Sequence, residues 1–199
     1  MESPKIIECP RDAMQGIRPF IPTTEKVNYL QFLLKVGFDS LDFGSFVSSR
    51  AVPQMRDSSD VLDQLDLSDT KTKLLAIVAN LRGAKTALNF EQIEYIGFPF
   101  SISENFQMRN THKTILESLI ILEKIKELTD KLNKTLVVYL SMGFGNPYGD
   151  PWSINVVSQW VERLAQIEIE IISLSDTIGQ ALPLDISNLF SLLIPAFPA

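Results

Sequence analysis

The sequence has 199 residues, of which 45% are hydrophobic, and this is enough for one globular domain with a substantial core. A formal net charge of −6 without a cluster of lysine or arginine argues against nucleic-acid binding, and no segment approaches the roughly 20 apolar residues that cross a bilayer. The single cysteine, Cys9, excludes an internal disulfide framework, and with a polar N-terminus that does not resemble a signal peptide it favours the cytoplasm.

Strand-like and helix-like segments alternate at intervals of about 30 to 40 residues, the length of a βα unit. Strands are predicted at 6–9, 40–43, 74–78, 95–100, 136–140 and 169–174. Helices are predicted from Thr23 to near Gly37, from Ser58 or Ser59 to Leu65, from Leu81 to Phe90, from Thr114 to Leu132, from Pro151 to Leu164, and between Pro183 and Phe197.

The predicted strands are apolar throughout, as in 74–78 and 136–140, without a polar alternation. Parallel strands covered by helices on both faces have this composition. The sequence therefore predicts an α/β fold of the (β/α)8 TIM-barrel type with about six of the eight βα units. Since such barrels usually need about 250 residues, residues 1–199 are expected to form a single, incomplete catalytic domain.

Polar residues follow the predicted strands, and in parallel α/β folds the carboxyl ends of the strands carry the ligand site. Arg11 could neutralise a carboxylate or enolate, Asp12 could ligate a divalent cation, and Asp42 could hold the arginine in place. Asp176 could handle the proton of a substrate hydroxyl. Simpler interpretations remain open, because Arg11 and Asp12 could form an ordinary ion pair and Asp176 could cap a helix.

Other motifs carry less chemistry. The stretch 143–149 is rich in glycine, but Pro147 stands where a nucleotide-binding loop would begin its helix, so we expect a loop at the mouth of the barrel. His112 is the only histidine and is expected at the surface, which excludes a Ser-His-Asp constellation within this sequence. Cys9 is expected to pack inside the first strand.

Several motifs occur together in one order along the chain. They are Pro10 to Gln15, Ser45 to Ser48, Val52 to Met55, Asn80 to Gly83, Ser103-Glu104, Gly145 to Tyr148 and Ser173 to Gly179. Over about residues 6–195, this set resembles hydroxymethylglutaryl-CoA lyase, a member of the metal-dependent aldolase-like barrels.

The resemblance implies cleavage of 3-hydroxy-3-methylglutaryl-CoA to acetoacetate and acetyl-CoA with Mg²⁺ or Mn²⁺, a reaction of leucine catabolism. It implies that Asp12 ligates the metal and that Arg11 stabilises the enolate. Asp42 would position the reacting groups, at a place where the family usually carries glutamate, and Asp176 would assist removal of the hydroxyl proton. The substrate-binding residues that it implies are Gln15, Ser45 and Asn80.

The sequence also departs from the family pattern, for example at Gln180-Ala181. The His-x-His pair of the seventh strand, the loop with the catalytic cysteine and a later asparagine ligand do not occur in it. We therefore expect a truncated product or a fragment that is inactive, or nearly so, by itself. A non-catalytic module that forms homo-oligomers through open barrel edges is one alternative. An isopropylmalate synthase-like condensing enzyme is another, although the stretch 45–55 argues against it.

Overall fold

The structure is a computed structural model that describes residues 4–197. Its contacts divide the chain into two compact units, one ending at Ile96 and the other beginning at Gly97. The prediction of a single catalytic domain over 1–199 stays a prediction.

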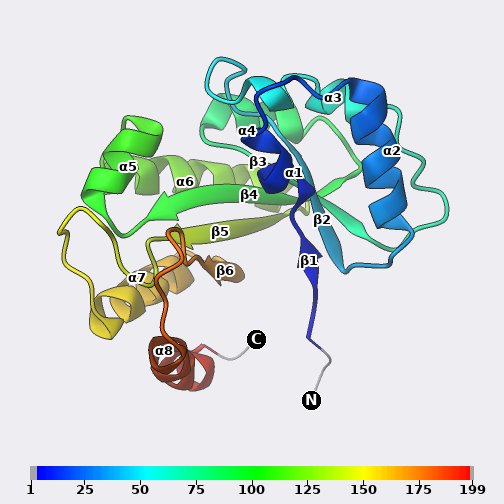
Figure 1. The fold of residues 1–199 in the computed structure, drawn as a ribbon. Coiled ribbons are helices and arrows are strands. Elements are labelled where there is room, and N and C mark those ends of the chain that lie inside the picture. The colour runs from blue at the N-terminus through cyan, green and yellow to red at the C-terminus, as the bar shows by residue number, and fades with distance from the viewer. Residues whose placement is uncertain (1–3, 198–199) are drawn as a thin grey trace. The chain divides into compact units, whose positions relative to one another are not determined.

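The first unit consists of βα units in chain order (Figure 1). Its elements are β1 (Ile7–Glu8), α1 (Pro10–Gln15), α2 (Thr23–Leu34), β2 (Ser40–Ser45), the 3-10 helix η1 (Pro53–Met55), α3 (Ser58–Leu62), β3 (Lys73–Ile77) and α4 (Leu81–Ala87). Strands β1, β2 and β3 pair in parallel, and the register between β2 and β3 shifts between Asp42 and Gly44.

The core of the first unit explains the apolar strands. All six residues of β2 are buried, as are the last four residues of β3. Leu30 and Leu34, four residues apart on α2, are also buried. Because helices cover these strands, their apolar residues show no alternation with polar ones.

Strand β4 (Ile93–Ser101) crosses the division between the units, and the remaining elements form the second unit. They are α5 (Glu104–Thr111), α6 (Ile115–Lys131), β5 (Thr135–Ser141), α7 (Ile154–Gln166), β6 (Ile171–Leu174) and α8 (Pro183–Ala196). Strands β5 and β6 are parallel, and over the described residues the six strands follow one another in the order β1-β2-β3-β4-β5-β6. Strand order in the sheet therefore equals chain order, as in a barrel of βα units and not as in a doubly wound sheet.

Most predicted elements are present, but several local predictions were wrong. Cys9 stands at the N-cap of α1 rather than inside β1. Arg11 and Asp12 follow β1 as predicted, but the helix α1 in which they lie was not predicted. Helix α5 was not predicted. The N-cap of α3 is Asp57 instead of a serine, and Asp176 caps no helix, because α8 begins after Leu182.

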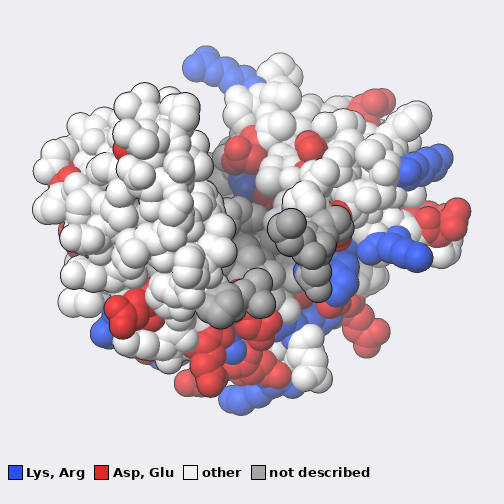
Figure 2. Space-filling model, turned by 90° about the horizontal axis from the view of Figure 1, so that it is seen from below, with Lys and Arg blue, Asp and Glu red and all other residues white. Residues whose placement is uncertain are grey.

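Helix α8 leaves much of its apolar surface exposed. Five of its large side chains, Leu184, Ile186, Phe190, Leu192 and Ile194, are at least 40% exposed. On the face drawn in Figure 2, charged side chains are sparse over a wide area, which agrees with the composition of α8. Among residues 4–197, no helix is long and apolar enough to cross a membrane.

Candidate functional site at the carboxyl ends of β1 and β2

The ion pair between Arg11 and Asp42 is the centre of the candidate site. Arg11 Nη2 lies 2.7 Å from Asp42 Oδ2, and Arg11 Nε lies 3.0 Å and 3.2 Å from the two carboxylate oxygens. The Asp42 side chain is 1% exposed and that of Arg11 is 12% exposed. Two parallel N–H donors therefore fix the plane of the guanidinium against a buried carboxylate. Although aspartate is one methylene shorter than glutamate, at position 42 it reaches the arginine.

Helix α1 places two further polar side chains beside this arginine. The helix begins directly after β1, with Pro10 in its first turn, where proline needs no N–H partner. Arg11 Nη1 donates to Asp12 Oδ1 at 3.1 Å and to Gln15 Oε1 at 2.8 Å. Gln15 Nε2 donates to the same oxygen of Asp12 at 2.9 Å. The first unit thus brings together Arg11, Asp12, Gln15 and Asp42.

Burial is the main cause of the pKa shifts of Asp42 and Cys9, which lie beside this arginine. It raises the pKa of Asp42 to about 6, although the hydrogen bonds and charge of Arg11 act in the opposite direction. Burial, together with the nearby charge of Asp42, also raises the pKa of the Cys9 thiol to about 11. Cys9 therefore stays protonated at neutral pH and is no nucleophile.

We expect the Arg11–Asp42 ion pair to weaken as the pH falls through about 6, because Asp42 then takes up a proton. The chemical shift of the Arg11 Nε–H group, followed by NMR between pH 8 and pH 4.5, should show this step. The folded protein binds this proton more tightly than the unfolded chain does, because the pKa of Asp42 is about 6 in the folded state and 3.8 otherwise. Protonation of Asp42 therefore increases the free energy of unfolding as the pH falls from about 6 towards 3.8, even though the ion pair weakens. Asp42→Asn is the control, and the same titration step in this variant would contradict the assignment.

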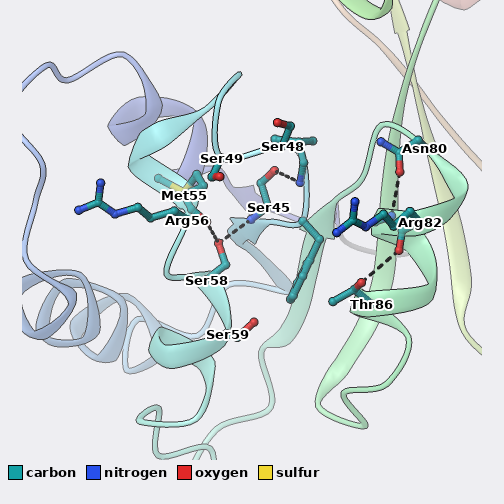
Figure 3. A pocket seen from close by; sticks show the side chains of 13 residues that line it. Ser45, Ser48, Ser49, Met55, Arg56, Ser58, Ser59, Asn80, Arg82 and Thr86 are labelled. Atoms are coloured by element: carbon teal, nitrogen blue, oxygen red, sulfur yellow. Dashed lines mark hydrogen bonds between the residues drawn. The ribbon is translucent and has the colours of Figure 1, made fainter.

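A pocket of about 470 Å³ lies between the segment after β2 and helices α3 and α4. Its lining includes Ser45 and Asn80, two residues predicted to bind substrate, but no aspartate or glutamate. In Figure 3, Arg56 and Arg82 stand on opposite sides of its serines, with Arg56 directed away from them. The Asn80 side-chain carbonyl caps α4 by accepting from the Gly83 N–H at 2.9 Å, so its amide group is the part that suits a ligand.

A second pocket, of about 380 Å³, is lined by Gln15, Arg18 and Arg56 among others. Gln54 also lines this pocket. Its side chain donates to the carbonyls of Ile17 and Pro19 and accepts from the Ile21 N–H. The segment after α1 is therefore held by a single buried side chain. Sequence reasoning included Gln54 only as part of a motif and gave it no role.

Asp176 lies in the second unit, in the exposed loop after β6. Its Oδ1 accepts from the Gln180 N–H and its Oδ2 from the Ala181 N–H, both at 2.9 Å. That Asp176 meets the Arg11 cluster at a common site stays a prediction.

The implied divalent cation finds one suitable ligand in the first unit. The side chain of Asp12 is 64% exposed, and its carboxylate supplies oxygen ligands, which Mg²⁺ and Mn²⁺ prefer. Within residues 4–197, no group of three or more His, Cys, Asp or Glu side chains is arranged to hold a metal ion. Asp12 therefore fits as one ligand, and the described residues do not supply a whole coordination shell.

Over the described residues, the six strands in chain order are typical of an α/β protein of the TIM-barrel type. Arg11 and two carboxylates lie at the carboxyl ends of its first two strands, where such folds carry their chemistry. The chain belongs to the hydroxymethylglutaryl-CoA lyase family, whose members are carbon–carbon lyases.

This assignment rests on relatives of known sequence and structure. The crystal structure of the Bacillus subtilis HMG-CoA lyase is 33% identical, covers 100% of this chain and 67% of that chain, and superimposes with a TM-score of 0.91. The hydroxymethylglutaryl-CoA lyase YngG of Bacillus subtilis is 34% identical over 190 residues, which are 96% of this chain and 63% of the relative. No family model matches the chain.

A third relative is described with ligands. The HMG-CoA lyase of Acinetobacter baumannii, in complex with coenzyme A and 3-methylmalate, has a TM-score of 0.91 at 25% identity, over 98% of this chain and 63% of that chain. The chain thus spans between 63% and 67% of the length of these three relatives. The predicted family and barrel-type fold are confirmed.

Proposed function

We propose that the cluster of Arg11, Asp12, Gln15 and Asp42 is the enolate-stabilising part of a site that cleaves 3-hydroxy-3-methylglutaryl-CoA into acetoacetate and acetyl-CoA. The observation that carries this proposal is the double hydrogen bond between Arg11 and the buried Asp42, with Asp12 and Gln15 on the other nitrogen of the guanidinium. The relatives named above are HMG-CoA lyases, which supports the same substrate.

In this reaction the C3 hydroxyl loses its proton, the C2–C3 bond breaks, and acetoacetate leaves. The bonding electrons remain on C2 and the thioester oxygen as an enolate, which is then protonated to acetyl-CoA. Arg11 stabilises this developing negative charge, because its guanidinium is held rigidly and is always protonated. Asp42 keeps the guanidinium in place, and Gln15 lines the substrate pocket.

A divalent cation, when bound, polarises the hydroxyl and carbonyl oxygens of the substrate as a Lewis acid. Asp12 is the residue of the described chain that would hold it. Asp176 takes the hydroxyl proton in this proposal, and the loop after β6 presents its exposed carboxylate.

The pocket that contains Ser45 and Asn80 takes the coenzyme A part of the substrate. Coenzyme A carries several phosphate charges, and a lining with Arg82, several hydroxyl groups and no carboxylate suits such an anion. The coenzyme A complex of the Acinetobacter baumannii relative supports a ligand of this class.

Calorimetric titration of the chain with HMG-CoA and with coenzyme A alone tests the proposal. We expect saturable binding of both ligands, and Arg82→Ala should weaken both about fivefold because it removes one exposed charge. Arg11→Gln should weaken only HMG-CoA, by about 10- to 100-fold, because one charge-assisted hydrogen bond is lost. Lys85→Ala, on the same helix as Arg82 but outside the pocket lining, is the control. No binding of HMG-CoA, or equal losses in both Arg11→Gln titrations, would contradict the proposal.

A cytoplasmic location is proposed as well. One rat relative at 29% identity is a lyase described as cytoplasmic, and this supports the proposed location. Another rat relative at 29% identity is described as mitochondrial, so lyases of this family occur in both places.

A further inference from the structure

The loop that carries Asp176 closes on itself through its own backbone. The N–H groups of Gln180 and Ala181 each donate to one oxygen of the Asp176 carboxylate. Gly179, with φ of +68°, makes the turn that brings these two N–H groups back to Asp176. All five residues from Asp176 to Gln180 are exposed, so packing contributes little to the orientation of the carboxylate.

Three hydrogen bonds fasten this loop to the glycine-rich segment after β5. The Met142 N–H donates to Thr177 Oγ1 at 2.8 Å, and the Gly143 N–H donates to the Ser175 carbonyl at 3.1 Å. Gln180 Nε2 donates to the Phe144 carbonyl at 3.0 Å.

The bond from Gln180 depends on the absence of a side chain at position 145. A Cβ atom on Gly145 would lie 1.7 Å from Gln180 Nε2, well inside van der Waals contact. Gly145 also has φ of +120°, a conformation that other residues rarely adopt. The glycine-rich segment therefore has a local shape that receives the amide of Gln180.

We propose that Gln180 is a positioning residue for Asp176. Its backbone N–H binds one carboxylate oxygen, and its side chain anchors the same residue to Phe144, so that the carboxylate keeps one orientation. The catalytic consequence rests on the role of Asp176 in the proposed function, whereas the anchoring is a property of the loop alone.

The test compares two substitutions at this position with the unchanged chain. Gln180→Ala removes the anchor, and Gln180→Glu keeps its size but presents a carboxylate without an N–H donor to the Phe144 carbonyl. Amide hydrogen exchange at residues 180 and 181 should become about two- to tenfold faster in both variants, as expected for one lost hydrogen bond, and should stay unchanged in α7. Gln166→Ala, an exposed residue at the end of α7, is the matched control.

Single-turnover kinetics, with protein in excess over HMG-CoA, give the second measurement. Both Gln180 variants should lower the rate of acetyl-CoA formation by about the same factor as exchange rises, without a change in the affinity for HMG-CoA. Unchanged exchange in both variants would overturn the anchoring. An unchanged rate in both, while Asp176→Asn lowers it, would overturn the positioning. If Asp176→Asn itself leaves the rate unchanged, the proposed role of Asp176 fails, and exchange still decides whether Gln180 anchors the loop.

Discussion

Replacing Arg11 with glutamine is expected to lower the rate of HMG-CoA cleavage by about 10²- to 10³-fold. Removal of one preorganised donor to a developing oxyanion costs this much in other sites of the kind. Glutamine retains a neutral N–H donor but cannot supply the fixed positive charge that Arg11 presents beside Asp42. Cleavage is followed under single-turnover conditions with Mg²⁺ or Mn²⁺, by chromatography of acetyl-CoA and acetoacetate, so that a slow rate of the unchanged chain is still resolved.

Arg163→Gln, in the last turn of α7, serves as the control for the loss of one arginine elsewhere, and its rate should equal that of the unchanged chain. Equal, measurable rates for the unchanged chain and Arg11→Gln would remove Arg11 from the mechanism.

The second large effect is on stability. Asp42→Ala is expected to lower the free energy of unfolding by about 3–5 kcal/mol, because it leaves a nearly buried guanidinium without its main charged partner. Urea denaturation at pH 7, followed by far-ultraviolet circular dichroism, measures this loss. Asp42→Asn should cost less, since the amide oxygen can still accept one hydrogen bond from Arg11.

The exposed Asp69→Ala is the control for the stability experiment, and its free energy of unfolding should stay within about 0.5 kcal/mol of the unchanged chain. A loss below about 1 kcal/mol in Asp42→Ala would show that the Arg11–Asp42 ion pair contributes little to stability.

The partnership of Arg11 and Asp42 could be predicted from the sequence, because both follow or end neighbouring parallel strands. The helix around Arg11 could not be predicted, since α1 has only six residues and is too short to show helical periodicity.

Other parts of the first unit depend on contacts that no local pattern encodes. Lys26 is 2% exposed, with its Nζ 2.5 Å from Asp57 Oδ1, and its charge also binds the Gln54 carbonyl. These partners lie 28 and 31 residues from Lys26 in sequence. A lysine in an amphipathic helix is normally expected to be exposed, whereas this one is buried among Phe20, Gln54 and Asp57.

The spacing of the site's partners along the chain bears on how the molecule folds. Arg11 and Asp42 are separated by 31 residues, and Gln54 reaches back 37 residues to Ile17. Closing loops of this size costs little more entropy than closing shorter ones, and contacts of modest separation form early. The guanidinium–carboxylate pair therefore needs only the first two strands and the segment between them to come together, and no residue of the second unit.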